Sequence, residues 1–236
     1  IDVRDAGNLA TKQSTPGRNR DLIRETARVI LNASAVPVLL GGDDSVPIPF
    51  FEAFETHGPL TIIQVDAHLD WREERNGSRH TFSSPMRRAS EMPWIERIIQ
   101  VGMRGIGGSR KKDLDDALRW GVRIIPAADV RRHGIGPVVD CVPDGARCVV
   151  TIDCDGLDPS VIPGVLVPQP GGLNFIDVME LFDGLAAKAW IEGIDVVELV
   201  PSRDVNGIGA LTAARFICKA IGCVASQRRR RDVTSS

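Results

Sequence analysis

The sequence predicts an α/β protein with a parallel sheet that is covered by helices on both sides. Short apolar runs rich in β-branched residues recur along the chain, and segments with a helical spacing of apolar residues lie between them. Acidic residues directly follow several of the apolar runs. The 236 residues suffice for one large domain, and we expect a single domain over residues 1–236.

The predicted strands are apolar runs without polar alternation, which is typical of strands buried on both faces of a parallel sheet. In chain order they are residues 36–40, 60–65, 97–101, 122–125, 147–152 and 191–199.

The predicted helices carry apolar residues three to four positions apart. They are residues 18–33, 109–120 and 175–187, followed by a closing helix over residues 206–223 that packs on the sheet or on a partner subunit. Alternating strands and helices predict parallel pairing, and such sheets bind ligands just beyond the carboxyl ends of their strands.

Composition excludes several classes of protein. With 43% hydrophobic residues, 25% charged residues and a formal net charge of −2, the chain shows no sign of binding nucleic acid. The longest uncharged apolar runs fall far below the roughly 18 residues that a spanning helix requires, so we expect no membrane partner. The five cysteines form no C-x-x-C pair, which favours a reduced, cytoplasmic location.

We expect both ends of the chain to differ from its middle. The sequence starts at Ile1 with a polar segment, so we expect an amino-terminal segment to be missing or cleaved, and we see no signal peptide. Four consecutive arginines at 228–231 predict a solvated, flexible tail over residues 226–236. Nucleic-acid binding or targeting is the alternative for these arginines.

Potential metal ligands follow two of the predicted strands. Asp66, His68 and Asp70 alternate along an extended segment, so their side chains point the same way and can converge on one ion. Asp153 and Asp155 repeat this spacing after another strand. Since these segments follow strands of one parallel sheet, we expect the five side chains to face one crevice.

This acidic cluster predicts bound cations. Each pair of like charges about 4 Å apart costs several kcal/mol at an intermediate dielectric, so the four carboxylates of this set need a compensating positive charge. Oxygen ligands with a single imidazole suit Mn²⁺ better than zinc, which favours Cys and His, or calcium, which takes oxygen alone. A helix cap or a turn explains an isolated aspartate, but not a set placed after apolar strands.

Three motifs resemble the metal-binding signatures of the ureohydrolase (arginase/agmatinase) family, and agmatinase-like members most of all. They are GGDDS at 41–45, DAHLD at 66–70 and TIDCDGLDP at 151–159, in the order that the family has. PGGL at 170–173 and DVVE at 195–198 also match, and the resemblance extends from about residue 36 to residue 220.

The resemblance implies a fold, an activity and a cofactor. The fold is a three-layer α/β/α sandwich with a mostly parallel central sheet, and the assembly is a homo-oligomer, either a trimer or a hexamer. The activity is hydrolysis of a small linear guanidino compound, such as agmatine or a guanidino acid, to urea and an amine. Two Mn²⁺ per subunit are implied, held by Asp44, Asp66, His68, Asp70, Asp153 and Asp155.

The resemblance also assigns roles within this set. Asp66 and Asp153 bridge the two metals. His68 and Asp155 complete one metal site, and Asp44 and Asp70 complete the other. Beyond the metals, the resemblance implies that Glu198 holds the substrate guanidinium through paired, charged hydrogen bonds. A surface ion pair at a strand end is the alternative for Glu198.

Asp44 departs from the family pattern, in which a histidine occupies this position. Five aspartates against two divalent cations leave the cluster at −1, so we expect a weaker Lewis acid and either a higher pKa for bound water or a changed metal preference. The alternative is that only one metal binds.

The family's proton-shuttle histidine is also replaced, because its aligned position is Phe82. His80 lies two residues earlier and is the candidate substitute, so Asp70, His80 and Glu198 are the catalytic candidates. The segment VLVPQ at 165–169 replaces small hydroxylated residues and a glutamate, which predicts a more apolar pocket. The family's amino-terminal strand and substrate loop are not recognisable before Arg18.

Trp71, directly after the DAHLD motif, is a candidate wall of the substrate pocket, with core packing as the alternative. The glycine-rich segment 102–108 fails the dinucleotide fingerprint because Arg110 stands where a glycine is needed, and a tight loop is the better account.

Two alternative functions stay open. One is hydrolysis of another C–N substrate, such as a formimino, ureido or biguanide compound, and the other is a metal-poor, degenerate subunit that acts as a structural partner.

Overall fold

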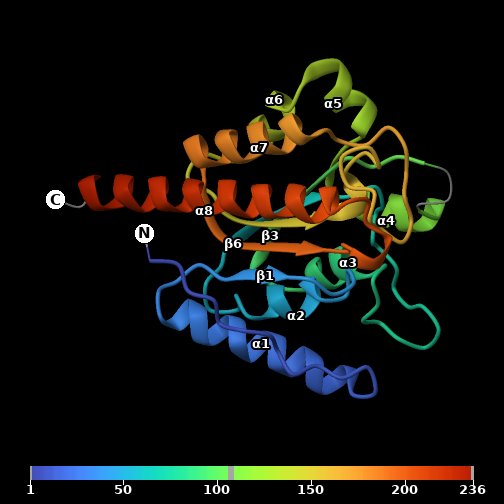
Figure 1. The fold of residues 1–236 in the computed structure, drawn as a ribbon, viewed down its shortest axis with the longest axis horizontal. Coiled ribbons are helices and arrows are strands. Elements are labelled where there is room, and N and C mark those ends of the chain that lie inside the picture. The colour runs from blue at the N-terminus through green and yellow to red at the C-terminus, as the bar shows by residue number, and fades with distance from the viewer. Residues whose placement is uncertain (1, 106–108, 235–236) are drawn as a thin grey trace.

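A six-stranded parallel sheet lies between two layers of helices (Figure 1). The computed structural model describes residues 2–105 and 109–234. Its strand order is β1-β6-β5-β2-β3-β4, and every neighbouring pair is parallel. The predicted α/β/α sandwich is therefore confirmed.

All six predicted strands are present. They are β1 (Val38–Leu40), β2 (Leu60–Val65), β3 (Ile95–Val101), β4 (Arg123–Ile125), β5 (Arg147–Asp153) and β6 (Trp190–Val197). The two central strands are β5 and β2, and every residue of β2 is buried, as its mostly apolar sequence predicts. We expected the last strand to reach residue 199, but β6 ends at Val197 because Glu198 has a positive φ of 61°, which is incompatible with a strand.

The helices form two layers, one on each face of the sheet (Figure 1). The first layer contains α1 (Pro16–Asn32), α2 (Pro47–Glu52), α3 (Pro85–Ala89) and α4 (Lys111–Trp120). The second contains α5 (Ala127–His133), α6 (Gly136–Asp140), α7 (Phe175–Lys188) and α8 (Ile208–Thr234). Helices α2, α3, α5 and α6 were not predicted, because five to seven residues are too few for a helical period to show.

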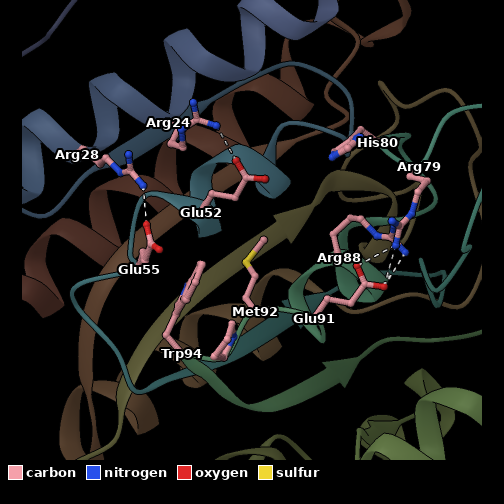
Figure 2. Close-up of a pocket in the computed structure, with 11 residues that line it drawn as sticks. Arg24, Arg28, Glu52, Glu55, Arg79, His80, Arg88, Glu91, Met92 and Trp94 are labelled. Carbon is pink, nitrogen blue, oxygen red and sulfur yellow. Dashed lines mark hydrogen bonds and ion pairs between the residues drawn. The ribbon is translucent and has the colours of Figure 1, made fainter.

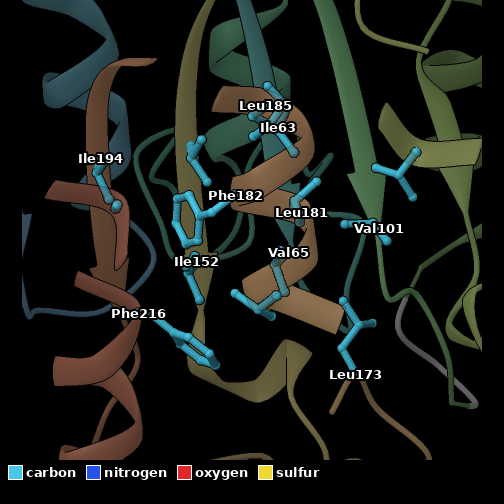
Figure 3. Close-up of a cluster of buried hydrophobic side chains, with 14 of the residues drawn as sticks. Ile63, Val65, Val101, Ile152, Leu173, Leu181, Phe182, Leu185, Ile194 and Phe216 are labelled. Atoms are coloured by element: carbon cyan, nitrogen blue, oxygen red, sulfur yellow. The ribbon is translucent and has the colours of Figure 1, made fainter. Parts of the chain in front are cut away.

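The alternation of side chains along the strands gives each face its own core. On β2, Ile63 and Val65 face the layer of α5–α8, whereas Leu60 and Ile62 face the layer of α1–α4. The rings of Phe182 and Phe216 cover the first of these cores (Figure 3). Burying one such side chain contributes about 1.5–3 kcal/mol, so the sheet is held rigidly beneath its carboxyl edge.

Helix α8 is longer than the closing helix that we predicted over residues 206–223. It continues to Thr234, and Gln227 is only 2% exposed. The Gln227 side chain accepts a hydrogen bond from Ile191 N (3.0 Å) and donates to Ala189 O (2.7 Å). The prediction of a flexible tail over residues 226–236 is therefore wrong at Gln227. For the residues that follow Gln227 it stays a prediction.

The apolar character of α8 has a structural cause. Residues Ile208–Arg230 are long and apolar enough to cross a membrane by length and composition, because an 18-residue stretch within them has a mean hydropathy of 1.6, and 39% of that stretch is buried. The helix nevertheless packs against α7 and β6, and Ala213, Phe216 and Ala220 belong to the core. Core packing accounts for part of this hydropathy, whereas Ile208 and Leu211 of the same helix are exposed.

Replacing Gln227 with methionine, which has a similar shape and no amide, tests the end of α8. The backbone N–H of Ile191 would lose its acceptor while buried, so we expect the free energy of unfolding to fall by about 1–3 kcal/mol. Chemical denaturation measures this change. Arg229→Ala, at an exposed position of the same helix, is the matched control and should change stability little. Equal stability of Gln227→Met and wild type would contradict the assignment.

Candidate metal centre

The sheet topology creates a crevice between β2 and β5. From β2 the chain proceeds outward to β3 and β4, whereas from β5 it proceeds to β6 on the other side. The loops that follow the two central strands therefore diverge, and such switch points are the ordinary ligand sites of parallel sheets. Val65 pairs with Ile152, so Asp66 and Asp153 follow side by side.

The structure brings the six predicted ligands together at this crevice. Potential ligand atoms of Asp44, Asp66 and Asp153 lie within 4.8 Å of one another, and so do those of Asp66, His68 and Asp155. The remaining member, Asp70, shares one hydrogen-bond donor with Asp66. Three segments that are distant in sequence thus converge, as the motifs predicted.

Asp44 has the most telling environment of the six. It is 2% exposed, and neither carboxylate oxygen has a hydrogen-bond partner among the described residues. A buried carboxylate without any partner costs several kcal/mol, so such an arrangement implies a ligand that the protein itself does not provide. Asp44 is therefore oriented for a cation, although histidine is the residue that the resemblance implies here.

The DAHLD motif folds into a tight turn rather than a simple extended comb. Asp66 Oδ1 accepts a hydrogen bond from His68 N at 2.6 Å, and Asp70 has a left-handed φ of 47°. The Asp70 carbonyl accepts from Arg87 N of α3 at 3.2 Å, which holds this strained residue in place. His68 Nδ1 lies 3.2 Å from Asp155 Oδ2.

The third motif approaches the second so closely that it requires a glycine. Asp153 Oδ1 accepts from Asp155 N at 2.8 Å, and this bond begins a 3₁₀ turn over Cys154–Gly156. A Cβ atom on Gly156 would lie 2.7 Å from Asp66 N, a distance that real Cβ contacts do not reach. The turn therefore brings the two metal-binding loops into direct contact.

Burial and mutual repulsion raise the pKa of several of these carboxyl groups. Loss of water raises the pKa of Asp44, Asp66 and Asp153 well above the ordinary value, and neighbouring carboxylates raise it further. The pKa of His68 is raised by its hydrogen bond to Asp155. Such groups become ionised at neutral pH when cations compensate them, and five carboxylates with one imidazole fit hard divalent cations such as Mn²⁺.

Glu198 lies beside this cluster, at the end of β6. Its Oε1 accepts a hydrogen bond from Asp44 N at 2.8 Å, while its own N–H donates to Gly42 O at 3.0 Å. Partial burial raises the pKa of its carboxyl group. Within the described part of the chain Glu198 makes no ion pair, so the surface ion pair considered from sequence is not what the structure shows.

His80 lies elsewhere, in a cavity of about 480 Å³ between α1, α2 and the segment around α3 (Figure 2). Arg24, Glu52 and Arg88 line the same cavity. Burial lowers the pKa of His80, and the charged groups that also act on it are arginines and Glu52 rather than the aspartates of the cluster. The structure therefore does not bring His80 to the metal centre.

Phe82 occupies the aligned shuttle position and is 44% exposed. The guanidinium of Arg75 lies 4.5 Å from the centre of its ring. The phenyl ring of Phe82 has no titratable group, so this position offers no replacement for the shuttle.

Trp71 is not a wall of the pocket in this structure. It is 3% exposed, belongs to the core on the α1–α4 side and packs edge-on against Trp120 at 6.2 Å. The positive φ of Asp70 redirects the chain, which explains why a residue next to the ligands points into the core.

Arg104 is a residue that we did not select from the sequence. Its guanidinium donates to backbone carbonyls of three segments, including Gly102 (3.0 Å), Asp155 (2.7 Å) and Gln169 (2.6 Å). It thereby fastens the third metal-binding loop to the end of β3 and to the segment 165–170. We predicted only a tight loop over 102–108, of which residues 106–108 lie outside the described part. A single arginine after a buried strand was the available signal.

Comparisons with known proteins agree with this geometry. The arginase family profile matches residues 1–223. An N(1)-aminopropylagmatine ureohydrolase of Thermus thermophilus is 35% identical over 204 residues, which cover 85% of this chain and 67% of that relative.

Two solved structures share the fold along most of the chain. Proclavaminate amidino hydrolase from Streptomyces clavuligerus matches with a TM-score of 0.85 at 26% identity, covering 94% of this chain and 76% of that one. Formimidoylglutamase from Bacillus subtilis matches with a TM-score of 0.83 at 28% identity, covering 93% and 71%.

The raised pKa values predict how the stability of the metal-free protein depends on pH. Above about pH 4 the folded state binds more protons than the unfolded state, because the pKa values of Asp44, Asp66 and Asp153 are raised on folding. The free energy of unfolding should therefore fall as the pH rises from about 5 to 8, and Mn²⁺ should restore it. Denaturation with and without chelator measures both effects.

Asp44→Asn removes one of these titrating groups, so its metal-free form should lose less stability over the same pH range. Asp140→Asn, at an exposed position in α6, should keep the wild-type slope. A metal-free wild type whose stability rises with pH over this range would refute the electrostatic description of the cluster.

Proposed function

The chain belongs to the arginase family, and we propose that it is a binuclear-metal hydrolase of linear guanidino compounds that releases urea and an amine. The observation that carries this proposal is the buried cluster of five aspartates and one histidine, with both oxygens of Asp44 lacking a protein partner. The relatives are hydrolytic enzymes of guanidino C–N bonds, which supports the reaction class.

Two Mn²⁺ fit the donor set. Asp66 belongs to both groups of ligand atoms, and Asp153 follows the neighbouring strand beside it, so these two residues are the candidates to bridge two ions. His68 and Asp155 complete one site, and Asp44 and Asp70 complete the other. When bound, such cations lower the pKa of water toward neutrality and polarise the substrate, which a poor electrophile such as guanidinium requires.

Glu198 is the candidate for binding the substrate guanidinium. Its carboxylate is anchored by Asp44 N, so it is held next to the metal ligands instead of swinging freely. A guanidinium offers planar N–H donors that match a carboxylate, and charged hydrogen bonds of this kind fix orientation as well as add affinity. Glu198 and Asp70 are thus the catalytic candidates that lie at the cluster.

The segment 165–170 suggests the character of the substrate tail. Val165 is buried, whereas Leu166 and Val167 are 51% and 50% exposed. Arg104 ties Gln169 O to the loop that carries Asp155, which keeps this apolar segment beside the metal centre. An aliphatic tail, as in agmatine or a guanidino acid, suits such a surface.

A second candidate substrate class is a formimino, ureido or biguanide compound. The likeness to formimidoylglutamase, at 28% identity, supports a formimino compound as the alternative substrate. The same cluster of ligands serves either class, since both reactions hydrolyse a C–N bond at an amidine-like or urea-like carbon.

We further propose a homo-oligomer in a reduced, cytoplasmic environment. Val205, Ile208 and Leu211 are 56%, 42% and 53% exposed, which leaves an apolar area that a subunit contact would cover. All five cysteines are free. The degenerate-subunit alternative predicts the same surfaces but no metal uptake.

A urea assay over a panel of guanidino compounds, after loading with Mn²⁺, tests the proposed reaction. We expect urea from at least one compound and none from Asp66→Asn, which removes the charge of the residue that belongs to both groups of potential ligands. Metal uptake without urea would favour the second substrate class, and absence of metal uptake would favour a degenerate subunit.

In the pH–rate profile, Asp44→His should shift the rise in rate to lower pH, because it restores charge balance at the cluster.

Glu198→Gln keeps the shape of the side chain and removes its charge. Losing a charged hydrogen bond to the guanidinium should lower kcat/KM by about 10- to 150-fold, equivalent to about 1.5–3 kcal/mol. Metal content should stay that of the wild type. Glu180→Gln, at an exposed position in α7, is the matched control. If Glu198→Gln retains wild-type kcat/KM, the guanidinium contact is ruled out.

A further inference from the structure

A row of buried polar side chains crosses the sheet directly beneath the metal centre. Gln100, Gln64, Thr151 and Asp195 are successive neighbours in the register of β3, β2, β5 and β6, and all four are completely buried. Gln64 precedes Asp66 by two residues, so both side chains lie on the same face. Polar groups in the interior cost free energy unless they are bonded, so the partners of this row indicate its purpose.

Two glutamines of this row bond to the DAHLD motif. Gln64 Nε2 donates to Asp66 Oδ2 at 2.6 Å and to Asp70 Oδ2 at 3.1 Å. Gln64 Oε1 accepts from Gln100 Nε2 at 2.5 Å. Gln100 Nε2 also donates to Leu69 O at 2.9 Å. The pair of amides thus contacts two carboxylates and the backbone between them.

The number of donors fixes the orientation of both amides. An amide nitrogen has two hydrogens, and each of the four is used: two on the carboxylates, one on Gln64 Oε1 and one on Leu69 O. A flipped Gln64 would place its oxygen against two carboxylates, which repel it. Gln100 prevents this flip, because it supplies a donor to the oxygen of Gln64.

The position of the donors also counters the repulsion within the cluster. Asp66 and Asp70 are like charges in a dry environment, and the Gln64 amide places one hydrogen on each of them. The carbonyl bond at Leu69 holds the backbone next to Asp70, whose φ of 47° is unfavourable for a residue with a side chain. The two hydrogen bonds from Gln64 and the one from Gln100 to Leu69 O together keep the carboxylates directed at the crevice.

We propose that Gln64, oriented by Gln100, is a positioning residue that holds Asp66 and Asp70 in their metal-binding arrangement. This inference rests on the proposed metal-dependent function of the cluster. Groups that bond to metal ligands commonly change metal affinity by about 10- to 100-fold when they are replaced. Gln64 acts on two ligands at once, and Gln100 acts through Gln64.

Calorimetric titration of Mn²⁺ into the metal-free full chain tests the proposal. Gln64→Met keeps the approximate volume and removes the donors, so Mn²⁺ should bind about 10- to 100-fold more weakly. Gln100→Met touches no carboxylate and should also weaken binding. Because the two residues act in series, the double variant should bind about as weakly as Gln64→Met alone, whereas independent effects would multiply.

Thr61→Val is the matched control, since it removes a polar group from a buried position at the opposite end of β2 and should leave Mn²⁺ affinity unchanged. Far-UV circular dichroism reports folding of each variant independently of metal. A folded Gln64→Met with wild-type affinity would overturn the proposal, and so would multiplicative losses in the double variant. If Gln64→Met does not fold, wild-type affinity of Gln100→Met overturns it. A wild type that takes up no Mn²⁺ would refute the proposed function itself.

Discussion

The central constraint on this structure is the repulsion between the carboxylates that the fold brings together at the carboxyl edge of its sheet. Asp44, Asp66 and Asp153 are buried, and each has a pKa raised by loss of water and by its acidic neighbours. A protein retains such a cluster when bound cations compensate it, since hydrophobic residues would otherwise be more stable there. Compensation of these charges is therefore the requirement to which the arrangement of the surrounding loops corresponds, and the proposed metal ions would meet it.

A few features of the scaffold hold the carboxylates close together at the crevice. The divergence of the chain after β2 and β5 opens the crevice, and Gly156 allows the two central loops to touch. Arg104 ties three segments through their carbonyl groups, and Gln64 holds two of the carboxylates from below. Rigid strands supply the ligands, and loops adjacent to them supply the contacts that set specificity.

Much of this was predictable from the sequence, and what was not has physical reasons. Strands of a parallel sheet are apolar runs, so all six are recognisable in the sequence, as are the potential ligands that follow them, although the edge strands β1 and β4 are only partly buried. Trp71 and His80 were misplaced because the left-handed turn at Asp70 and the path of the loop after it depend on tertiary contacts. Gln64 and Gln100 interrupt apolar runs, a signal that becomes informative once the strand register places them side by side.

Anomalous scattering at the manganese edge, from crystals of the Mn²⁺-loaded protein, is the most direct measurement of the central claim. The account predicts two peaks in the crevice, one among Asp44, Asp66 and Asp153 and the other among Asp66, His68 and Asp155. A map with no peak among these carboxylates would contradict it.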